Sequence, residues 1–387
     1  MEPQRVGIVG YGGFGQFLHY AWASCERVRI VAAADSDPLR NPGPPVRFFT
    51  RWEDLVAAPG IELVAVATPP RTHADIACEA MQQGKHILVE KPLAVTRQEA
   101  RRVIETRDRT GMVAGIDYML RFNPLVEAIT ALTHEGSLGA LRRAVVENYA
   151  QDEVLPPEHW FWDRSRSGGI FVEHGVHFFD LINNLAASSP RNINGACHQR
   201  NERQEDRAVA TVAYEDGLMA THYHAFSRPG FFEQTFIRLV YDLAEIDLEG
   251  WIPLSGRVRA LVNQATEGNL HRLPGFRIVH KVDIEDVEDL SRPEGWGRKR
   301  LDTRREGMIT SGGRSYQADS LITGTFAAAG SKGQVYTDSL RRLLADLLDR
   351  IEDSRHVMRV GLEEGLSSLD MALWADQAAR VDQAPVP

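Results

Sequence analysis

The hydrophobic residues of the first third of the chain form short apolar runs, separated by segments with helical spacing. The runs predict strands over residues 5–10, 28–35, 63–70 and 86–90. The segments between and after them predict helices. The helix after Thr96 has Glu99 three residues on, a capping box, and Gly111 at its far end. Strands this apolar, separated by helices, predict a parallel sheet covered on both faces.

The pattern changes after about residue 120. We expect a helix from Phe122 to about His134 and another near 175–186, on either side of an irregular stretch rich in Trp, Pro and Gly. Residues 208–249 alternate apolar and polar positions around turns, which predicts antiparallel strands. On one of them, His222 and His224 share a sheet face, and we expect a solvated or interface position for both.

The last third is less regular. Residues 281–333 are charged, and we expect loops and short edge strands there, followed by amphipathic helices over 339–351 and 364–381. We therefore divide the chain into an α/β domain, residues 1–120, and an α+β domain, residues 121–387.

The composition is that of a soluble globular protein. With 387 residues, the chain exceeds the size at which one core usually stops growing. The net charge is -9, and no basic cluster is dense enough to follow a phosphate backbone, so we expect no nucleic-acid partner. No apolar stretch reaches about 18 residues and no signal peptide is evident, so we expect no membrane segment and a cytoplasmic location. Cys25, Cys78 and Cys197 are sparse and odd in number, which is typical of reduced thiols.

The stretch GYGGFG, residues 10–15, matches the GxGxxG pattern through Gly10, Gly12 and Gly15. It follows a predicted strand and opens a predicted helix, which is the context of a dinucleotide-binding turn. Gly10 permits the tight turn, Gly12 allows close approach to a pyrophosphate, and Gly15 allows the helix to pack on the strand. Gly13 and Phe14 lie in the same turn and are expected beside the cofactor.

Asp35 ends the second strand, 20 residues after Gly15. A carboxylate here accepts both ribose hydroxyls of NAD and repels a 2'-phosphate, so the sequence favours NAD over NADP. Arg40 is close enough in sequence to hold such a phosphate, which leaves NADP as the alternative.

The order of motifs resembles the glucose-fructose oxidoreductase, inositol dehydrogenase and rhizopine-catabolism (Gfo/Idh/MocA) family. The shared motifs are the glycine turn, the acid after the second strand, ATPP at 67–70, EKP at 90–92, RFNP at 121–124 and GGxxxExGVHxxD at 168–180. This resemblance implies a Rossmann domain followed by a domain with a large open, mostly antiparallel sheet, which often mediates dimers or tetramers. It also implies an active site in the cleft between the domains.

In the family, the lysine of EKP, here Lys91, is catalytic; without the flanking motifs, a surface lysine capping a strand would be the simpler interpretation. We expect Glu90 to orient Lys91 or to pack against the nicotinamide ribose instead of transferring a proton, and a cis bond before Pro92 is common in the family. His177 is the second catalytic candidate, since a histidine can accept the hydroxyl proton. Glu173 stands where the family usually has Asp, and at four residues' spacing we expect it to orient His177 and raise its pKa.

Further residues have weaker assignments. Thr68, Pro69, Pro70 and His73 are expected beside the nicotinamide half of the cofactor. Arg121, Trp162, Arg164 and Arg166 are candidate substrate contacts, and a salt bridge between domains is an equal alternative for Arg121. The two loop arginines, Arg164 and Arg166, favour an anionic or phosphorylated sugar, and a solvated loop is the alternative for them. His174 and His177 lack a third ligand at suitable spacing, so we expect no metal.

These observations favour an NAD-dependent dehydrogenase or reductase acting on a sugar, polyol or related cyclic alcohol, with Lys91, His177 and Glu173 handling the proton. Two alternatives stay open. One is a glycosidase in which tightly held NAD oxidises the sugar transiently so that elimination breaks the glycosidic bond. The other is a non-catalytic dinucleotide sensor, against which intact Lys91 and His177 argue.

Overall fold

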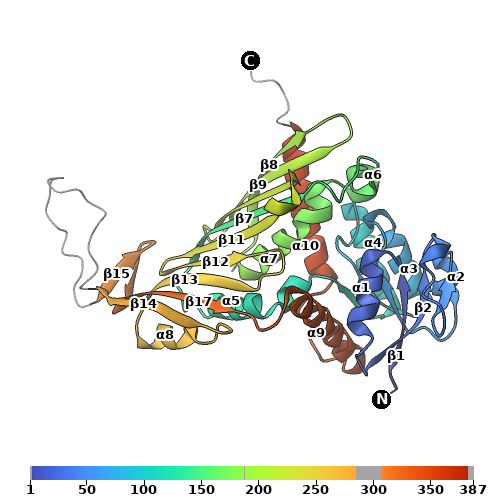
Figure 1. Ribbon diagram of the computed structural model, residues 1–387, viewed down its shortest axis with the longest axis horizontal. Coiled ribbons are helices and arrows are strands. Elements are labelled where there is room, and N and C mark those ends of the chain that lie inside the picture. Colours follow the sequence, from blue (N-terminus) through green and yellow to red (C-terminus); the bar gives the residue numbers. More distant parts are fainter. Residues whose placement is uncertain (1, 187, 285–306, 382–387) are drawn as a thin grey trace.

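Figure 1 shows the computed structural model, which describes residues 2–186, 188–284 and 307–381. The first part of the chain, in blue, forms one sheet with its helices, and the green, yellow and orange parts form a second, larger sheet. The fold class predicted from the sequence is confirmed: a parallel sheet of the Rossmann type precedes a mostly antiparallel one.

The first sheet is parallel, with the strand order β3-β2-β1-β4-β5-β6. Its strands are β1 (Gln4–Val9), β2 (Val28–Ala34), β3 (Arg47–Phe49), β4 (Leu63–Val66), β5 (His86–Val89) and β6 (Ala114–Ile116). The helices are α1 (Gly13–Trp22), α2 (Trp52–Ala57), α3 (His73–Gln82) and α4 (Arg97–Thr110). The strand order reverses between β1 and β4, and at such a switch point the loops that leave the strands diverge and open a crevice.

The predicted ends of α4 are confirmed. The Thr96 side chain accepts a hydrogen bond from the Glu99 N–H, 3.2 Å away, and Gly111 ends the helix with a φ of 70°. Local capping signals are therefore sufficient to place this helix.

The second sheet has the order β14-β17-β13-β12-β11-β7-β10-β9-β8. Its strands are β7 (Leu141–Gln151), β8 (Pro190–Gln199), β9 (Glu205–Tyr214), β10 (Met219–Arg228), β11 (Gln234–Tyr241), β12 (Ala244–Glu249), β13 (Ser255–Val262), β14 (Arg277–Asp283) and β17 (Ser320–Ala327). The strands β15 (Met308–Ser311) and β16 (Arg314–Gln317) form a separate hairpin. Neighbouring strands of the large sheet are antiparallel, except that β7 and β10 are parallel.

The expectation of only loops and short edge strands over 281–333 needs correction. β17 lies inside the sheet between β14 and β13, and its side chains alternate between buried and less buried positions. The charged residues on either side of this eight-residue run hide its alternation when the segment is considered as a whole. Part of the predicted segment, residues 285–306, lies outside the described residues.

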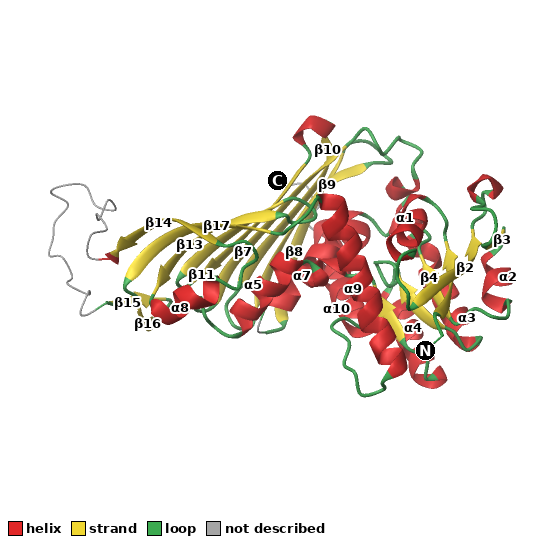
Figure 2. Cartoon of the chain, turned by 60° about the horizontal axis from the view of Figure 1, so that its bottom comes forward, coloured by secondary structure: helices red, strands yellow, loops and turns green. Residues whose placement is uncertain are grey.

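Helices cover one face of the large sheet, as Figure 2 shows. The helices that follow β6 are α5 (Pro124–His134), α6 (Arg164–Ser167), α7 (Val176–Leu185), α8 (Gln264–Leu270), α9 (Lys332–Glu352) and α10 (Leu362–Val381). Of these, α7, α8 and α10 contact strands of the large sheet, while α9 contacts α1 and α10 also contacts α4 of the first domain. Of the described helices, none is both long enough and apolar enough to cross a membrane.

The positions of His222 and His224 also differ from the expectation. Both side chains are fully buried on the covered face of β10, where His222 contacts Phe179 and His224 contacts Phe178 of α7. The alternation along the strand was correctly identified, but the histidine face is the core face.

Candidate active site

A cavity of about 1040 Å³ lies where the carboxyl ends of β1, β4, β5 and β6 meet the second domain. Its lining includes the glycine turn, the ends of these strands, the segment before α7, and two aromatic residues from distant parts of the chain, Trp251 and Tyr336. Of the predicted site residues, those that line it are Gly10, Gly12, Gly13, Phe14, Asp35, Thr68, Pro69, Pro70, Glu90, Lys91, Arg166, Glu173 and His177.

The glycine turn has no room for side chains at two positions. Gly10 has a φ of 89°, and a Cβ on it would lie 2.4 Å from the Ala67 carbonyl oxygen. A Cβ on Gly15 would lie 2.0 Å from the Gly10 carbonyl oxygen, so α1 approaches β1 as closely as backbone allows. Gly13, by contrast, faces open space. This cradle fits a dinucleotide, whose pyrophosphate needs close approach to backbone amides at the start of a helix.

Asp35 follows β2 at the edge of the cavity. Its carboxylate accepts hydrogen bonds from the Tyr11 N–H (2.8 Å) and the Asp37 N–H (3.0 Å), and it pairs with the Arg40 guanidinium (3.0 Å). The carboxylate is nearly buried, at 7% exposure, whereas Arg40 is 45% exposed. The acid is therefore held in place by backbone, and the arginine, which also pairs with Asp37, is the more exposed partner.

His73, predicted beside the cofactor, does not line the cavity. Its side chain is fully buried, and its two ring nitrogens each lie 2.7 Å from a carbonyl oxygen, of Pro92 and of Thr68. Burial lowers the pKa of His73, and the two carbonyls oppose that effect. The residue joins the end of β4 to the turn after β5, and we remove it from the cofactor contacts. The Lys91–Pro92 bond beside it is cis.

Lys91 and Glu173 meet inside the cavity from positions far apart in the sequence. The Lys91 ammonium group donates to a carboxylate oxygen of Glu173 and to its backbone carbonyl oxygen, both at 2.8 Å. The two side chains are 12% and 14% exposed, so the pair is largely shielded from water. Glu173 is on a π-helical turn, Phe171–Gly175, that precedes α7 and directs this side chain toward β5.

His177 lies one turn further, in the same cavity, but its environment differs from the expectation. Burial, followed by the charge of Lys91, holds its pKa well below the usual value, whereas we expected Glu173 to raise it. The carboxylate of Glu173 bonds to Lys91 instead. The Nδ1 atom of His177 is buried without a hydrogen-bond partner among the described residues, and the residue lines the cavity.

Trp251, from the loop between β12 and β13, is a lining residue that sequence reasoning missed. Its ring stacks on His174 at 5.4 Å and meets His177 edge-on at 4.7 Å. Burial, with the charge of Lys91, lowers the pKa of His174 to about 3, so this imidazole is neutral at ordinary pH. Nothing in the sequence near Trp251 marks it, since its place depends on the pairing of distant strands. His159, Trp160 and Tyr336 complete this end of the cavity.

Asp117 is a second residue that was missed. It directly follows β6, as Glu90 follows β5, and these neighbouring strands pair Val89 with Ile116. Both carboxyl groups line the cavity, and they are in hydrogen-bonding contact with each other. The signal that could have found Asp117 is its position, since the carboxyl ends of parallel strands meet at one edge.

The structure does not bring three of the four predicted substrate contacts into the cavity, and that prediction needs correction. Arg121 makes two bonds to the Asp180 carboxylate, at 2.7 and 2.9 Å. The Trp162 indole N–H donates to backbone carbonyls of its own loop, and Arg164 pairs with Glu205 and Asp376. Arg166 alone of the four lines the cavity, and it is exposed.

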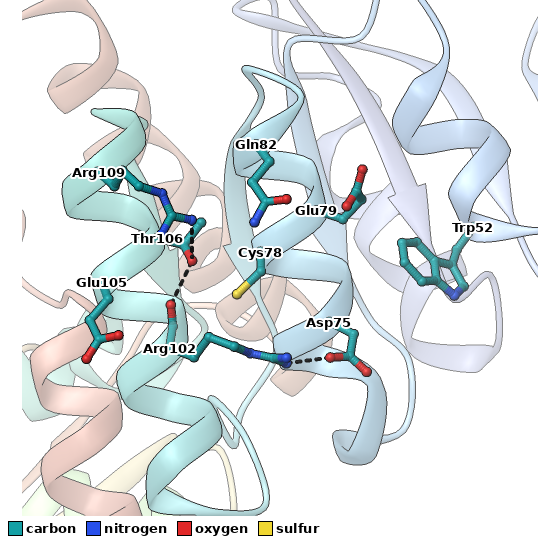
Figure 3. Close-up of a pocket in the computed structure, with 9 residues that line it drawn as sticks. All are labelled: Trp52, Asp75, Cys78, Glu79, Gln82, Arg102, Glu105, Thr106 and Arg109. Carbon is teal, nitrogen blue, oxygen red and sulfur yellow. Dashed lines mark hydrogen bonds and ion pairs between the residues drawn. The ribbon is translucent and has the colours of Figure 1, made fainter.

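A separate, smaller cavity of about 460 Å³ lies between α3 and α4 (Figure 3). Arg102 pairs with Asp75 across it, and Arg109 donates to Thr106. Its walls carry both signs of charge, and it is lined by residues of three helices, α2, α3 and α4, instead of by strand ends. We assign no chemistry to it.

Among the described residues, one group has metal-ligand spacing: Cys197, Glu205 and Asp376. Both carboxylates already pair with Arg164 and Arg380. Burial raises the pKa of Cys197 to about 12, so its thiol stays protonated, and only a thiolate binds metal well. The group is therefore an ion-pair cluster.

A glycine turn with no space for a side chain at Gly10 or Gly15, at the head of a doubly wound parallel sheet, defines a dinucleotide-binding Rossmann protein. Family profiles narrow the class. Residues 4–118 match the oxidoreductase family with an NAD-binding Rossmann fold, and residues 126–238 match the GFO/IDH/MocA C-terminal domain. Together they cover more than half of the chain, which belongs to the Gfo/Idh/MocA oxidoreductase family.

The curated relatives agree with this assignment. The chain is 33% identical over 196 residues to the rhizopine catabolism protein MocA of Rhizobium meliloti, covering 50% of this chain and 60% of that protein. It is 28% identical over 204 residues to the scyllo-inositol 2-dehydrogenase (NAD(+)) of Bacillus subtilis, covering 50% and 58%. The matched region thus spans about 60% of the length of these relatives.

Solved structures share the whole fold. GenD2 from gentamicin A biosynthesis, in complex with NAD, has a TM-score of 0.72 at 18% identity, covering 98% of this chain and 95% of that one. Biliverdin reductase from Synechocystis, in complex with biliverdin and NADP+, has a TM-score of 0.70 at 18% identity, covering 98% and 99%. At this level of identity the likeness concerns the fold alone.

Proposed function

We propose that this protein is an oxidoreductase that transfers a hydride between a nicotinamide cofactor and a carbon bearing a hydroxyl group, in a sugar, polyol or related cyclic alcohol. One observation carries the proposal. The cavity that begins at the glycine turn ends at Lys91, Glu173 and His177, so a dinucleotide bound in the turn would have proton-handling groups at its far end.

The nicotinamide cofactor, when bound, accepts or gives the hydride. The chain supplies the rest. Glu173 fixes the Lys91 ammonium group, which then has a donor available for the oxygen of a substrate hydroxyl or carbonyl. His177 is neutral because burial and Lys91 lower its pKa, so its Nε2 is able to accept the hydroxyl proton. The Trp251 ring, edge-on to His177, adds an apolar surface to this end of the cavity.

We propose NAD as the preferred cofactor. The Asp35 carboxylate is nearly buried and held by two backbone N–H groups, so a 2'-phosphate beside it would meet a fixed negative charge. Arg40, which could bind such a phosphate, is paired with Asp35. Relatives with similar folds are named with NAD in one case and NADP+ in another.

Two observations support the proposed substrate class: the side chains that line the cavity, and the activities named for similar proteins. Aromatic rings of Trp160 and Trp251 lie in the cavity with polar groups from His159, Lys91 and His177, a mixture that suits a ring carrying several hydroxyls. Curated relatives include dehydrogenases for scyllo-inositol and inositol and a reductase for 1,5-anhydro-D-fructose.

A dehydrogenase screen tests the proposal. NAD and NADP would be offered in parallel with free sugars, polyols, cyclitols, sugar acids and nucleotide sugars, and reduced nucleotide would be followed by absorbance. We expect turnover with NAD on at least one cyclic polyhydroxy compound. Cofactor binding without turnover on any class would favour the sensor, and glycoside cleavage with no net NADH would favour the transient-oxidation glycosidase.

We also propose a homodimer or homotetramer built on the open face of the large sheet. On β10, Met219, Thr221 and Tyr223 point away from the face where His222 and His224 are buried, and Met219 is 56% exposed. Light scattering tests this, because a mass near 43.2 kDa would mean a monomer. The division at residue 120 remains a proposal as well, supported by the end of the parallel sheet at Ile116.

A further inference from the structure

Glu90 and Asp117 bring two carboxyl groups into contact on the floor of the cavity. Each residue directly follows a strand, β5 or β6, and the backbone pairing of these strands fixes the two positions side by side. Asp117 is 2% exposed, so its carboxyl group is shielded from water. Two carboxylates in contact would repel each other strongly in such a place.

The hydrogen-bonding environment of Glu90 and Asp117 requires that one of the two carboxyl groups stays protonated. Asp117 Oδ1 accepts from the Met119 N–H at 3.1 Å, but Oδ2 is buried and has no donor among the described residues. The side chain of Asp117 is in contact with the carboxyl of Glu90. Since an ionised carboxylate cannot donate, the contact becomes a hydrogen bond only if one of the two carboxyls keeps its proton. Burial raises the pKa of both, and the proximity of Asp117 raises that of Glu90 further.

The charged and titratable groups around the pair leave its remaining charge unbalanced. Lys91 faces both carboxyls, but its ammonium group is bonded to Glu173, so these two neutralise each other. The phenols of Tyr336 and Tyr118 also face Glu90, and burial raises the pKa of each, so both are neutral. One negative charge remains at the strand ends.

We propose that Glu90 and Asp117 share a single proton and hold one negative charge under the cofactor, so that the site binds the oxidised nicotinamide, which is positive, more tightly than the reduced one. The second half of this inference rests on the proposed function, because it places the nicotinamide in this cavity. Asp117 acts on the cofactor through Glu90, which makes it a positioning residue.

Infrared spectroscopy tests the shared proton without any turnover. Wild-type protein at pH 7 is expected to show a carboxylic acid C=O band that shifts in D2O. The band is expected to disappear in Glu90→Gln and in Asp117→Asn, because the remaining carboxyl then ionises and accepts from the new amide. It persists in Glu135→Gln, a control at an exposed carboxylate. Absence of the band in wild-type protein, or its survival in both single variants, would overturn the pairing.

Cofactor binding tests the charge. Calorimetry would measure the affinities for NAD+ and for NADH. Contacts that both forms make contribute equally to the two affinities, so their contribution cancels in the ratio. Each single variant keeps one negative charge and is expected to keep the ratio. The double variant has none, and its ratio is expected to fall by about tenfold, since one charge at close range in a partly dry site contributes roughly this much or more.

The outcomes are distinguishable. A fall of the ratio in each single variant would mean that both carboxyls were ionised, and no change in the double variant would mean that the pair does not sense the cofactor; either result overturns the inference. Failure of wild-type protein to bind either nucleotide would overturn the proposed function, and the charge coupling with it, while the infrared band would still decide on the shared proton. Thermal melting would show that the variants fold.

Discussion

The Lys91 ammonium group lies 2.8 Å from both the side-chain carboxylate and the backbone carbonyl oxygen of Glu173, so a residue 82 positions further along the chain fixes its orientation. We expect Lys91→Ala to lower kcat by about 10²- to 10⁴-fold, because it removes the donor for the substrate oxygen. Steady-state kinetics with the best compound of the screen would measure this. NAD affinity, measured separately, is expected to change much less.

Glu173→Asp is the matched variant for this pair. It keeps the charge but is one methylene shorter, so we expect weaker orientation of Lys91 and a smaller loss of kcat than for Glu173→Gln. Unchanged turnover in Lys91→Ala, with cofactor still bound, would contradict the proposed mechanism.

Gly15→Ala is expected to destabilise the first domain whether or not a cofactor is present. Its Cβ would lie 2.0 Å from the Gly10 carbonyl oxygen, so α1 must move away from β1. The expected loss in unfolding free energy is about 1–3 kcal/mol, as for other overpacked sites. Gly13→Ala is the control, since its Cβ would meet no atom within 4 Å. Urea denaturation would compare the two, and equal losses would contradict the prediction.

Most of the first domain could be predicted because its signals are local. Apolar runs gave the strands β1, β2, β4 and β5, and the residues Thr96, Glu99 and Gly111 gave the ends of α4. In the second domain the antiparallel character was predictable from alternation. The parallel pairing of β7 with β10 and the interior place of β17 were not, because partners far apart in sequence decide them.

The active-site residues also divide into those that local motifs predict and those that depend on distant parts of the chain. Motifs identified Lys91, Glu173 and His177, and the structure brings them into one cavity. They could not show which polar side chains already had partners: Arg121 bonds to Asp180 and is only 10% exposed. Nor could they supply Trp251, whose position depends on the whole large sheet.

Asp35→Ser is expected to shift cofactor preference toward NADP. The change removes the fixed negative charge and releases Arg40, which is 45% exposed and able to turn toward a 2'-phosphate. We expect NADP affinity to rise and NAD affinity to fall, each by roughly tenfold, as for one charged hydrogen bond gained or lost. Calorimetry with both nucleotides would measure this. In Asp35→Ser combined with Arg40→Ala, the gain for NADP should vanish; if it persists, Arg40 is not its source.

Acid is expected to destabilise the protein below about pH 6.5 through its buried histidines. Burial, followed by the nearby His174, holds the pKa of His224 well below the usual value, so the folded state excludes a proton that the unfolded chain binds. Stability therefore rises with pH in this window and is fully present above the unfolded pKa of about 6.5. We expect His224→Leu to reduce the pH slope of the unfolding free energy by up to about 1.4 kcal/mol per pH unit.

The neighbouring Phe178→Leu disturbs the same packing without removing a titrating group, so it should lower stability and leave the slope unchanged. Denaturation curves between pH 5 and 7 would decide, and an equal slope in wild-type protein and His224→Leu would show that this histidine takes up no proton on unfolding.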